Sequence, residues 1–253
     1  MAIPAYSSQS HIPTHEMKME SAQLDLLSPI WSSPLQEREV ANAFALSFSP
    51  RLVQHLIGQY SRPGDTVLDC FLGSGTTMIE AQLMGRHSIG VDCNEEYLTA
   101  VRELPALAGH ALEPALFCAD ARQMPFLPDD AVDLIVTQPP YGGTHRYSRN
   151  NPHDLSLLSQ RDFLVAIEGL ADELYRVLKE DGICALLIGD IKERGRIMPL
   201  GFQFVHRFLS RGFSVKDIYD HRTPSSNLPT ALHPHEYLFL FQKKQKAPKR
   251  PRL

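Results

Sequence analysis

The stretch Thr66-Val67-Leu68-Asp69-Cys70-Phe71-Leu72-Gly73-Ser74-Gly75-Thr76-Thr77 decides the fold of this chain. Residues 66–70 are a short apolar run typical of a buried strand, and apolar side chains recur at helical spacing over residues 78–84. Between them, Gly73 and Gly75 permit a tight bend whose backbone can approach a ligand closely. A strand, a glycine-rich bend and a helix in this order predict the first unit of a doubly wound α/β sheet, with free helix amides facing the ligand.

Strands and helices alternate through the rest of the chain. Apolar residues at helical spacing predict helices that begin near residues 51, 95, 163 and 200. The third of these helices is expected to end in the sequence Lys179-Glu180-Asp181-Gly182. Short apolar runs predict strands at residues 88–92, 115–119, 132–137, 183–188, 213–219 and 237–242. Residues 221–235, with three prolines and three histidines, are expected to form a loop that holds no metal.

Three of the predicted strands lead into an aspartate, namely Asp69, Asp92 and Asp120. Open α/β sheets bind ligands at the carboxyl edge, so this repetition favours a ligand site there. Asp92 lies 17 residues after Gly75, close to the spacing at which a carboxylate accepts hydrogen bonds from ribose hydroxyls. The same residue could instead cap the following helix, and the sequence leaves both roles open.

The predicted strand at residues 132–137 runs directly into Gln138-Pro139-Pro140-Tyr141. Proline fixes its own φ and restricts the residue before it to extended geometry, so this segment is a rigid platform suited to a flat polar group. A polar stretch, residues 142–154, follows and is expected to form a lid or substrate loop. Within it, cations alternate with an aromatic residue, which suits phosphates and an extruded base as well as an ordinary surface loop: His145, Arg146, Tyr147 and Arg149.

Charge divides the chain unevenly. The formal net charge is -4, but six of the 25 Lys and Arg residues lie in residues 243–253, which contain no acid. Residues 1–242 therefore carry 19 basic against 29 acidic residues. The basic tail could hold a polyanion or serve only as a solubilising end. We expect an arm at residues 1–35, one catalytic domain at residues 36–242, and the tail at residues 243–253.

Composition limits the class of protein. No apolar run approaches the roughly 18 residues that a membrane helix needs, and no leader pattern opens the chain, so we expect a soluble, cytoplasmic protein. The four cysteines lie in or beside apolar runs without CxxC spacing, and we expect all of them to be buried free thiols. No metal site is expected from this pattern.

Four segments together resemble a known family, and they are DCFLGSGTT at residues 69–77, GVDCN at 90–94, CADAR at 118–122 and TQPPY at 137–141. They are similar to motifs of S-adenosylmethionine-dependent methyltransferases that modify exocyclic amines, especially the N4-cytosine and N6-adenine DNA methyltransferases with the glycine motif before the PPY motif. The resemblance covers about residues 48–242. It implies a mostly parallel, seven-stranded Rossmann-like sheet whose last strand is antiparallel, DNA as substrate, and a place in restriction-modification.

The resemblance also implies the residues of the site. Asp92 would hold the ribose of S-adenosylmethionine, and Asp120 would contact the adenine amine. The full set of implied cofactor contacts is Phe48, Ser49, Asp69, Phe71, Gly73, Gly75, Thr76, Thr77, Asp92, Asp120 and Ala121. The implied catalytic residues are Thr137, Gln138, Pro139, Pro140 and Tyr141.

An exocyclic amine is a poor nucleophile because its lone pair is delocalised into the ring. Acceptors at the Gln138 side chain and the Pro139 carbonyl would localise that lone pair and aim it at the methyl group, while Tyr141 would stack on a base that has been flipped out of the duplex. The family usually has Ser before PPY in cytosine enzymes and Asp or Asn in adenine enzymes. Glutamine at position 138 therefore leaves the base undecided, with N4 of cytosine ahead of N6 of adenine.

Three other functions remain open at this stage. The segment DARQMPF with DLIVTQPPYG also resembles tRNA guanine-N2 methyltransferases, although those enzymes carry an additional RNA-binding domain for which we expect no room here. Protein glutamine methyltransferases use a similar Asn-Pro-Pro-Tyr platform. An inactive cofactor-binding subunit with a specificity or nuclease partner is the fourth hypothesis, and the intact motif residues argue against it.

Overall fold

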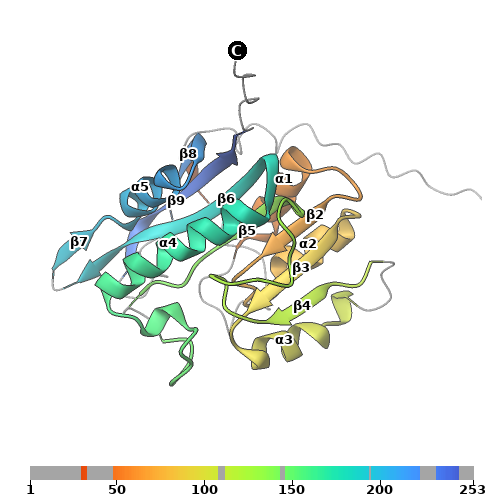
Figure 1. The fold of residues 1–253 in the computed structure, drawn as a ribbon, viewed down its shortest axis with the longest axis horizontal. Helices are drawn as coiled ribbons and strands as arrows, with labels where there is room; N and C mark the ends of the chain where they lie inside the picture. The colour runs from red at the N-terminus through yellow and green to blue at the C-terminus, as the bar shows by residue number, and fades with distance from the viewer. Residues whose placement is uncertain are drawn as a thin grey trace, which may run out of the picture.

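The computed structural model describes residues 30–32, 48–107, 112–142, 146–193, 195–222 and 232–244. Within these residues a single mixed sheet is covered by helices on both faces (Figure 1). The strands are β1 (Ile30–Ser32), β2 (Thr66–Asp69), β3 (His87–Asp92), β4 (Ala115–Cys118), β5 (Val132–Thr137), β6 (Leu178–Glu193), β7 (Arg196–Met198), β8 (Phe213–Arg222) and β9 (Leu232–Lys243). The helices are α1 (Pro50–Tyr60), α2 (Thr76–Leu83), α3 (Glu95–Arg102), α4 (Gln160–Val177) and α5 (Leu200–Ser210), with short 3-10 turns at Pro105–Leu107 and Leu155–Leu157.

The strand order places the ligand edge at the centre of the sheet. The order is β1-β8-β9-β6-β5-β2-β3-β4, and β7 pairs with β6. From β2 the chain moves outward through β3 and β4, and then returns to the other side of β2 with β5 and β6. The order thus reverses between β2 and β5, which is where open parallel sheets form a crevice at the carboxyl ends of their strands.

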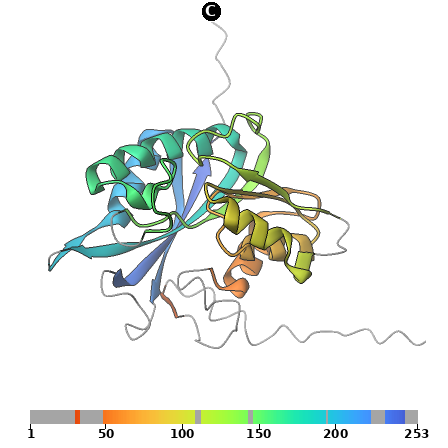
Figure 2. The same ribbon diagram turned by 90° about the horizontal axis from the view of Figure 1, so that it is seen from below.

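Alternating side chains bury both faces of the sheet. In β6, one set of alternate residues packs with α4 and α5, and the intervening set packs with α1. The same division occurs in β9. Seen after a quarter turn, helices lie on either side of the sheet (Figure 2). A strand covered on both faces reads as a continuous apolar run, which explains why these strands could be recognised in the sequence.

The predicted architecture is confirmed. Seven longer strands form a mostly parallel sheet, and the last strand, β9, is antiparallel to both β6 and β8. The structure adds two strands of three residues each, β1 and β7. None of the described helices is both long and apolar enough to cross a membrane.

Two predicted boundaries were wrong. Helix α4 ends at Val177, and residues 178–182, expected at the end of the helix, belong to β6, because Leu178 already pairs with Val132 of β5. The loop expected at residues 221–235 is shortened at both ends, because β8 and β9 pair as far as Arg222 and His235. Pro234 is tolerated within β9 where the pairing with β6 shifts register, since a strand proline is confined to edges and irregularities.

The cysteines are less buried than predicted. All four are free, and Cys70 and Cys184 are buried in the core as expected. Cys93 is only partly buried and Cys118 is exposed. Cys118 ends β4, the outermost strand on its side of the sheet, so no further strand covers that edge among the described residues.

Lys243, the first residue of the predicted basic tail, ends β9 inside the protein with a 4% exposed fraction. Its ammonium group donates to Asp130 Oδ1 at 2.6 Å. It also donates to the carbonyl oxygens of Tyr175 and Leu178 at 2.7 and 2.6 Å. Three acceptors satisfy all three ammonium protons, so this lysine fastens β9 to the end of α4.

Replacing Lys243 with methionine should lower the free energy of unfolding by about 2–4 kcal/mol, because buried acceptors lose a charged donor. The measurement is urea unfolding followed by circular dichroism. Lys244→Met is the matched control, because Lys244 is exposed and its replacement should change the value by no more than about 0.5 kcal/mol. Equal effects of the two substitutions would contradict this role for Lys243.

Candidate active site

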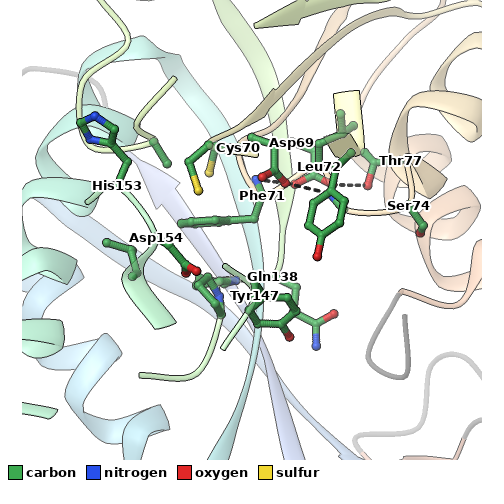
Figure 3. A pocket seen from close by; sticks show the side chains of 18 of the residues that line it. Asp69, Cys70, Phe71, Leu72, Ser74, Thr77, Gln138, Tyr147, His153 and Asp154 are labelled. Carbon is green, nitrogen blue, oxygen red and sulfur yellow. Dashed lines mark hydrogen bonds between the residues drawn. The ribbon is translucent and has the colours of Figure 1, made fainter. Parts of the chain in front are cut away.

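A cavity of about 250 Å³ opens at the carboxyl ends of the central strands. Figure 3 shows the loop after β2 on one side of it and His153 with Asp154 on the other. The lining residues are Phe48, Asp69, Cys70, Phe71, Leu72, Gly73, Ser74, Thr76, Thr77, Asp92, Cys93, Tyr97, Ala119, Ala121, Gln138, Pro139, Pro140, Tyr141, Tyr147, His153, Asp154 and Leu155. The cavity thus brings together the glycine-rich bend, the end of β3 and the platform, as the sequence predicts.

Asp69 connects the walls of this cavity. Its Oδ2 accepts a hydrogen bond from the Thr77 hydroxyl at 2.8 Å (Figure 3). Its Oδ1 accepts from the Phe71 amide at 3.1 Å and from the Thr137 hydroxyl at 2.9 Å. Burial raises the pKa of Asp69 to about 6, although the hydrogen bonds from Thr77, Phe71 and Thr137 lower it in part. One carboxylate therefore holds the loop, helix α2 and the end of β5 in register.

Gly73 and Asp92 shape the floor of the cavity. The Gly73 amide donates to Asp92 Oδ2 at 3.1 Å, and the Asn94 amide donates to Oδ1 at 2.9 Å. An ionised carboxylate has about four acceptor sites, so Asp92 retains capacity for further donors. Gly73 has φ +50°, and a Cβ there would meet only Phe71 O, at 3.8 Å, so its missing side chain leaves open space. The cap of α3 is Asn94, whose side chain accepts from Glu96.

Three predicted cofactor residues do not line the cavity. Ser49 precedes α1, where its carbonyl accepts from Val53. Gly75 has φ +80° and lies against Val101, because a Cβ there would approach that side chain to 2.9 Å.

Asp120 is the third, although its neighbours Ala119 and Ala121 do line the cavity. Its carboxylate pairs with Arg122 at 2.6 Å and with His153 at 3.0 Å. Burial alone would raise its pKa, but the hydrogen bonds from Arg122 and His153 outweigh burial and lower it. Contact with an adenine amine would require Asp120 to exchange one of these partners.

The platform presents Gln138 to the cavity. Gln138, Pro139 and Pro140 line it, whereas Thr137 is fully buried and bonded to Asp69. The Oε1 atom of Gln138 is buried and has no hydrogen-bond partner among the described residues. Leaving such an acceptor unsatisfied costs about 1–3 kcal/mol, so this atom is suited to a donor supplied by a ligand.

Tyr141 is fastened more firmly than the sequence predicts. It lines the cavity, yet its exposed fraction is only 1%. Its hydroxyl donates to Glu236 Oε1 at 3.0 Å and accepts from the Gly189 amide at 3.0 Å. Burial, together with the nearby charge of Glu236, raises the pKa of Tyr141 well above its usual value, so the phenol remains neutral. Stacking of its ring on a base stays a prediction.

The segment after the platform closes one side of the cavity. Asp154, which is buried, accepts hydrogen bonds from the amides and hydroxyls of both Ser148 and Ser156. The Asn151 side chain donates to the carbonyl of Cys93 at 2.6 Å, which attaches the segment to the end of β3. Tyr147 thereby lies in the cavity wall, and burial raises its pKa to about 12.

Sequence reasoning missed several wall residues, namely Cys70, Leu72, Ser74, Cys93, Tyr97, Ala119, His153, Asp154 and Leu155. Only position after a strand end could have indicated Cys70, Cys93 and Ala119. His153 and Asp154 lie in the polar stretch predicted as a lid, but nothing in its composition separates them from their neighbours.

The predicted nucleic-acid residues divide between two places. Tyr147 lines the cavity, while Arg146 and Arg149 are exposed. A polar groove adjoins the cavity at Tyr147 and is lined by Asn94, Glu96, Arg146, Tyr147, Ser148, Arg149 and Asn151. His145 lies outside the described residues, so the structure does not place it.

The charge of the cavity fits a cationic ligand. Asp69, Asp92 and Asp154 line it, and none of the described lining residues is Lys or Arg. S-adenosylmethionine carries a sulfonium and an ammonium, and its ribose diol can donate to the spare acceptor sites of Asp92. Across the described parts of the chain, no group of three or more His, Cys, Asp or Glu residues could hold a metal ion.

Comparison with protein families decides the relationship. The model of the DNA methylase family matches residues 6–103 and 132–252, most of the chain. The chain belongs to the DNA methylase family. A second model, the RMKL-like methyltransferase domain, matches residues 59–156 and so spans both the glycine bend and the platform. The predicted family is thereby confirmed.

Relatives of this DNA methylase family member act on several substrates. The Type II methyltransferase M1.MboII of Moraxella bovis is 53% identical over 47 residues, 19% of this chain and 18% of that protein. A tRNA (guanine(10)-N2)-dimethyltransferase of Methanothermobacter thermautotrophicus is 36% identical over 177 residues, 67% and 48% of the two chains. A release factor glutamine methyltransferase of Caulobacter vibrioides is 33% identical over 132 residues, 49% and 45%. Each match spans less than half of the relative.

Solved structures agree on the fold. TrmN from Thermus thermophilus aligns with TM-score 0.57 and 24% identity, covering 83% of this chain and 55% of that one. A SAM-dependent methyltransferase from Methanosarcina mazei aligns with TM-score 0.55 and 17% identity, covering 79% and 100%. The DNA methylase family member therefore has a Rossmann-like methyltransferase fold, and S-adenosylmethionine is the cofactor that its family and fold imply.

The bond between Thr137 and Asp69 should appear in the pH dependence of stability. The folded pKa of Asp69, about 6, exceeds the unfolded value of about 3.9, so its stabilising contribution is full below pH 3.9 and is lost as pH rises through 6. Removing the hydroxyl with Thr137→Val should raise the folded pKa further. Its stability deficit relative to Thr137→Ser, which keeps the hydroxyl, should grow by about 1–2 kcal/mol between pH 4 and pH 8 in urea titrations. A deficit independent of pH would contradict the assignment.

Proposed function

We propose that this protein transfers the methyl group of S-adenosylmethionine to an exocyclic amine of a base in DNA, with N4 of cytosine favoured over N6 of adenine. The observation that carries the proposal is the buried Oε1 of Gln138 in the cavity wall, which has no partner among the described residues. An amine offers only donor hydrogens to such an atom. The two prolines that follow have no amide hydrogen, so they add acceptors to the platform and no backbone donors.

The chemistry asks the protein to localise a lone pair. The bound cofactor supplies an electrophilic methyl group. Gln138 Oε1 and the Pro139 carbonyl would accept the two amine hydrogens, which draws the nitrogen toward tetrahedral geometry and stabilises the positive charge that develops on it. The platform is rigid before the amine arrives, so little reorganisation is needed. The methylated nitrogen then loses a proton to water without a dedicated base.

The cavity walls would hold the cofactor through Asp92, at the ribose, and through the loop containing Phe71 and Gly73. Spare acceptor sites on Asp92 suit a diol, and the open space at Gly73 lets a ligand approach the backbone. Tyr97 and Tyr147 are aromatic walls for the flat adenine. Asp120 keeps its proposed contact with the adenine amine only if His153 releases it.

RNA is the second candidate substrate. The match to the tRNA (guanine(10)-N2)-dimethyltransferase covers 67% of this chain, far more than the short match to M1.MboII. Guanine N2 is also an exocyclic amine, and the glutamine side chain modified by the release factor enzyme is an amide. All of these acceptors are NH₂ groups on an sp² carbon, so Gln138 has the same task with each of them. The family match favours DNA.

A labelling experiment tests the reaction and its substrate. The protein is incubated with tritiated S-adenosylmethionine and separately with DNA, total RNA or protein extract, and labelled nucleosides are identified by mass spectrometry. We expect label in DNA as N4-methylcytosine. Label in RNA or protein would favour the corresponding alternative, and no transfer to any fraction would overturn the proposed activity.

Gln138→Leu should lower the rate of transfer about 10²–10³-fold, because it keeps the shape of the side chain but removes the acceptor. Binding of S-adenosylmethionine, measured by equilibrium dialysis, should change little. Gln59→Leu is the control, since Gln59 is exposed on α1. Full activity of Gln138→Leu would show that the platform does not act through this oxygen.

Arg146 and Arg149 would bind phosphates along the polar groove. The double substitution to alanine should raise the KM for the polynucleotide and reduce the slope of log affinity against log salt by about 1 for each phosphate that is no longer neutralised. Affinity for S-adenosylmethionine should not change. Arg62→Ala is the matched control, because Arg62 is exposed before β2, at the opposite edge of the sheet. An unchanged salt slope would exclude phosphate binding by this pair.

A further inference from the structure

We propose that Glu236 is a positioning residue for the platform, because by taking the proton of Tyr141 it keeps Gln138 Oε1 free for the acceptor amine. The proposal rests on the proposed function, since it concerns the same amine. It assigns a role to a residue that does not line the cavity and belongs to a distant part of the chain.

The contact begins at the junction of two antiparallel strands. Gly189 of β6 and Glu236 of β9 are register partners, and the Tyr141 hydroxyl bonds to both of them. It donates to the carboxylate and accepts from the amide, each at 3.0 Å. Tyr141 and Glu236 are buried, with exposed fractions of 1% and 6%. The phenol is therefore fixed in both position and proton direction.

Gln138 meets the same hydroxyl with its side chain. A phenol has one proton, and that of Tyr141 goes to Glu236. Gln138 can then only donate to the hydroxyl, which assigns its amide nitrogen to Tyr141. The amide oxygen is left over, and it is the buried Oε1 without a partner among the described residues. The carboxylate at position 236 thus determines which atom of Gln138 remains available.

Loss of the carboxylate would reverse this arrangement. The phenol would need another acceptor because it is buried, and Gln138 Oε1 is the acceptor beside it that no described residue satisfies. Tyr141 would then occupy the atom intended for the amine. A role limited to fastening the ring makes a different prediction, since an aromatic ring can be packed without a buried carboxylate, which is costly to desolvate.

The two roles are separated by single-turnover transfer from tritiated S-adenosylmethionine to the substrate fraction that the wild-type protein labels. Glu236→Leu should slow transfer about tenfold or more, because an acceptor is blocked. Glu236→Gln keeps an acceptor oxygen and should remain within about threefold of wild type. Tyr141→Phe cannot block Oε1, so the double variant Tyr141→Phe/Glu236→Leu should recover the rate of Tyr141→Phe alone.

Binding and stability measurements accompany each variant. The Kd for S-adenosylmethionine should change by less than about twofold, and transfer is measured well below each melting temperature. Gln242→Leu is the control, because Gln242 also lies on β9 but its side chain donates to the Asp181 carbonyl, at 3.2 Å, and not to the platform. If Glu236→Leu does not fold, Glu236→Met, which is unbranched, carries the same expectations with the same double variant.

Wild-type transfer by Glu236→Leu, or a double variant no faster than Glu236→Leu, would overturn the positioning role while leaving the proposed function intact. Absence of transfer by the wild-type protein to DNA, RNA and protein would overturn both together. Recovery in the double variant supports the proposal, since a loss of packing alone cannot be repaired by removing a second buried polar group.

Discussion

Asp69 places a carboxylate inside the protein at the carboxyl end of β2, where its oxygens receive hydrogen bonds from Phe71, Thr77 and Thr137. These donors belong to the glycine-rich loop, to α2 and to the end of β5. The sheet order reverses between β2 and β5, so the strands themselves leave a crevice there. The buried carboxylate closes the base of that crevice. Its raised pKa records what this arrangement costs in desolvation.

The platform is therefore held at both ends. Thr137 ties its beginning to Asp69, and Tyr141 ties its end to Glu236 and Gly189. Between these contacts lie Gln138 and two prolines, whose backbone has little freedom. Rigidity at this point has a chemical use, because an acceptor that is already in place costs no reorganisation when the amine binds.

Local features of the sequence were enough to predict most elements. β5 and α5 begin and end where their apolar patterns do, and the glycine bend could be recognised because φ > 0 favours glycine at Gly73 and Gly75. The end of α4 was misjudged because pairing of Leu178 with β5 overrides helical spacing. Such a contact joins segments far apart in the chain, and no local pattern contains it.

The site was predictable to the same extent and for the same reason. Residues on the strand ends could be placed, since parallel strands end at one edge of the sheet. Tyr97, His153 and Asp154 reach the cavity through packing of separate segments, so spacing could not reveal them. Asp120 illustrates the converse case, because its position was right but its carboxylate is engaged by Arg122 and His153.

Glutamine at position 138 acquires a physical explanation from these contacts. The Tyr141 hydroxyl has already given its proton to Glu236, so the residue beside it has to donate or remain apart. An aspartate there would bring a second acceptor to a phenol with no proton left to share, and a serine would have to give up its single proton. An amide can donate with one atom and accept with the other. Gln138 and Glu236 are therefore matched, which means that the identity of residue 138 reflects its protein neighbour as well as the base it faces.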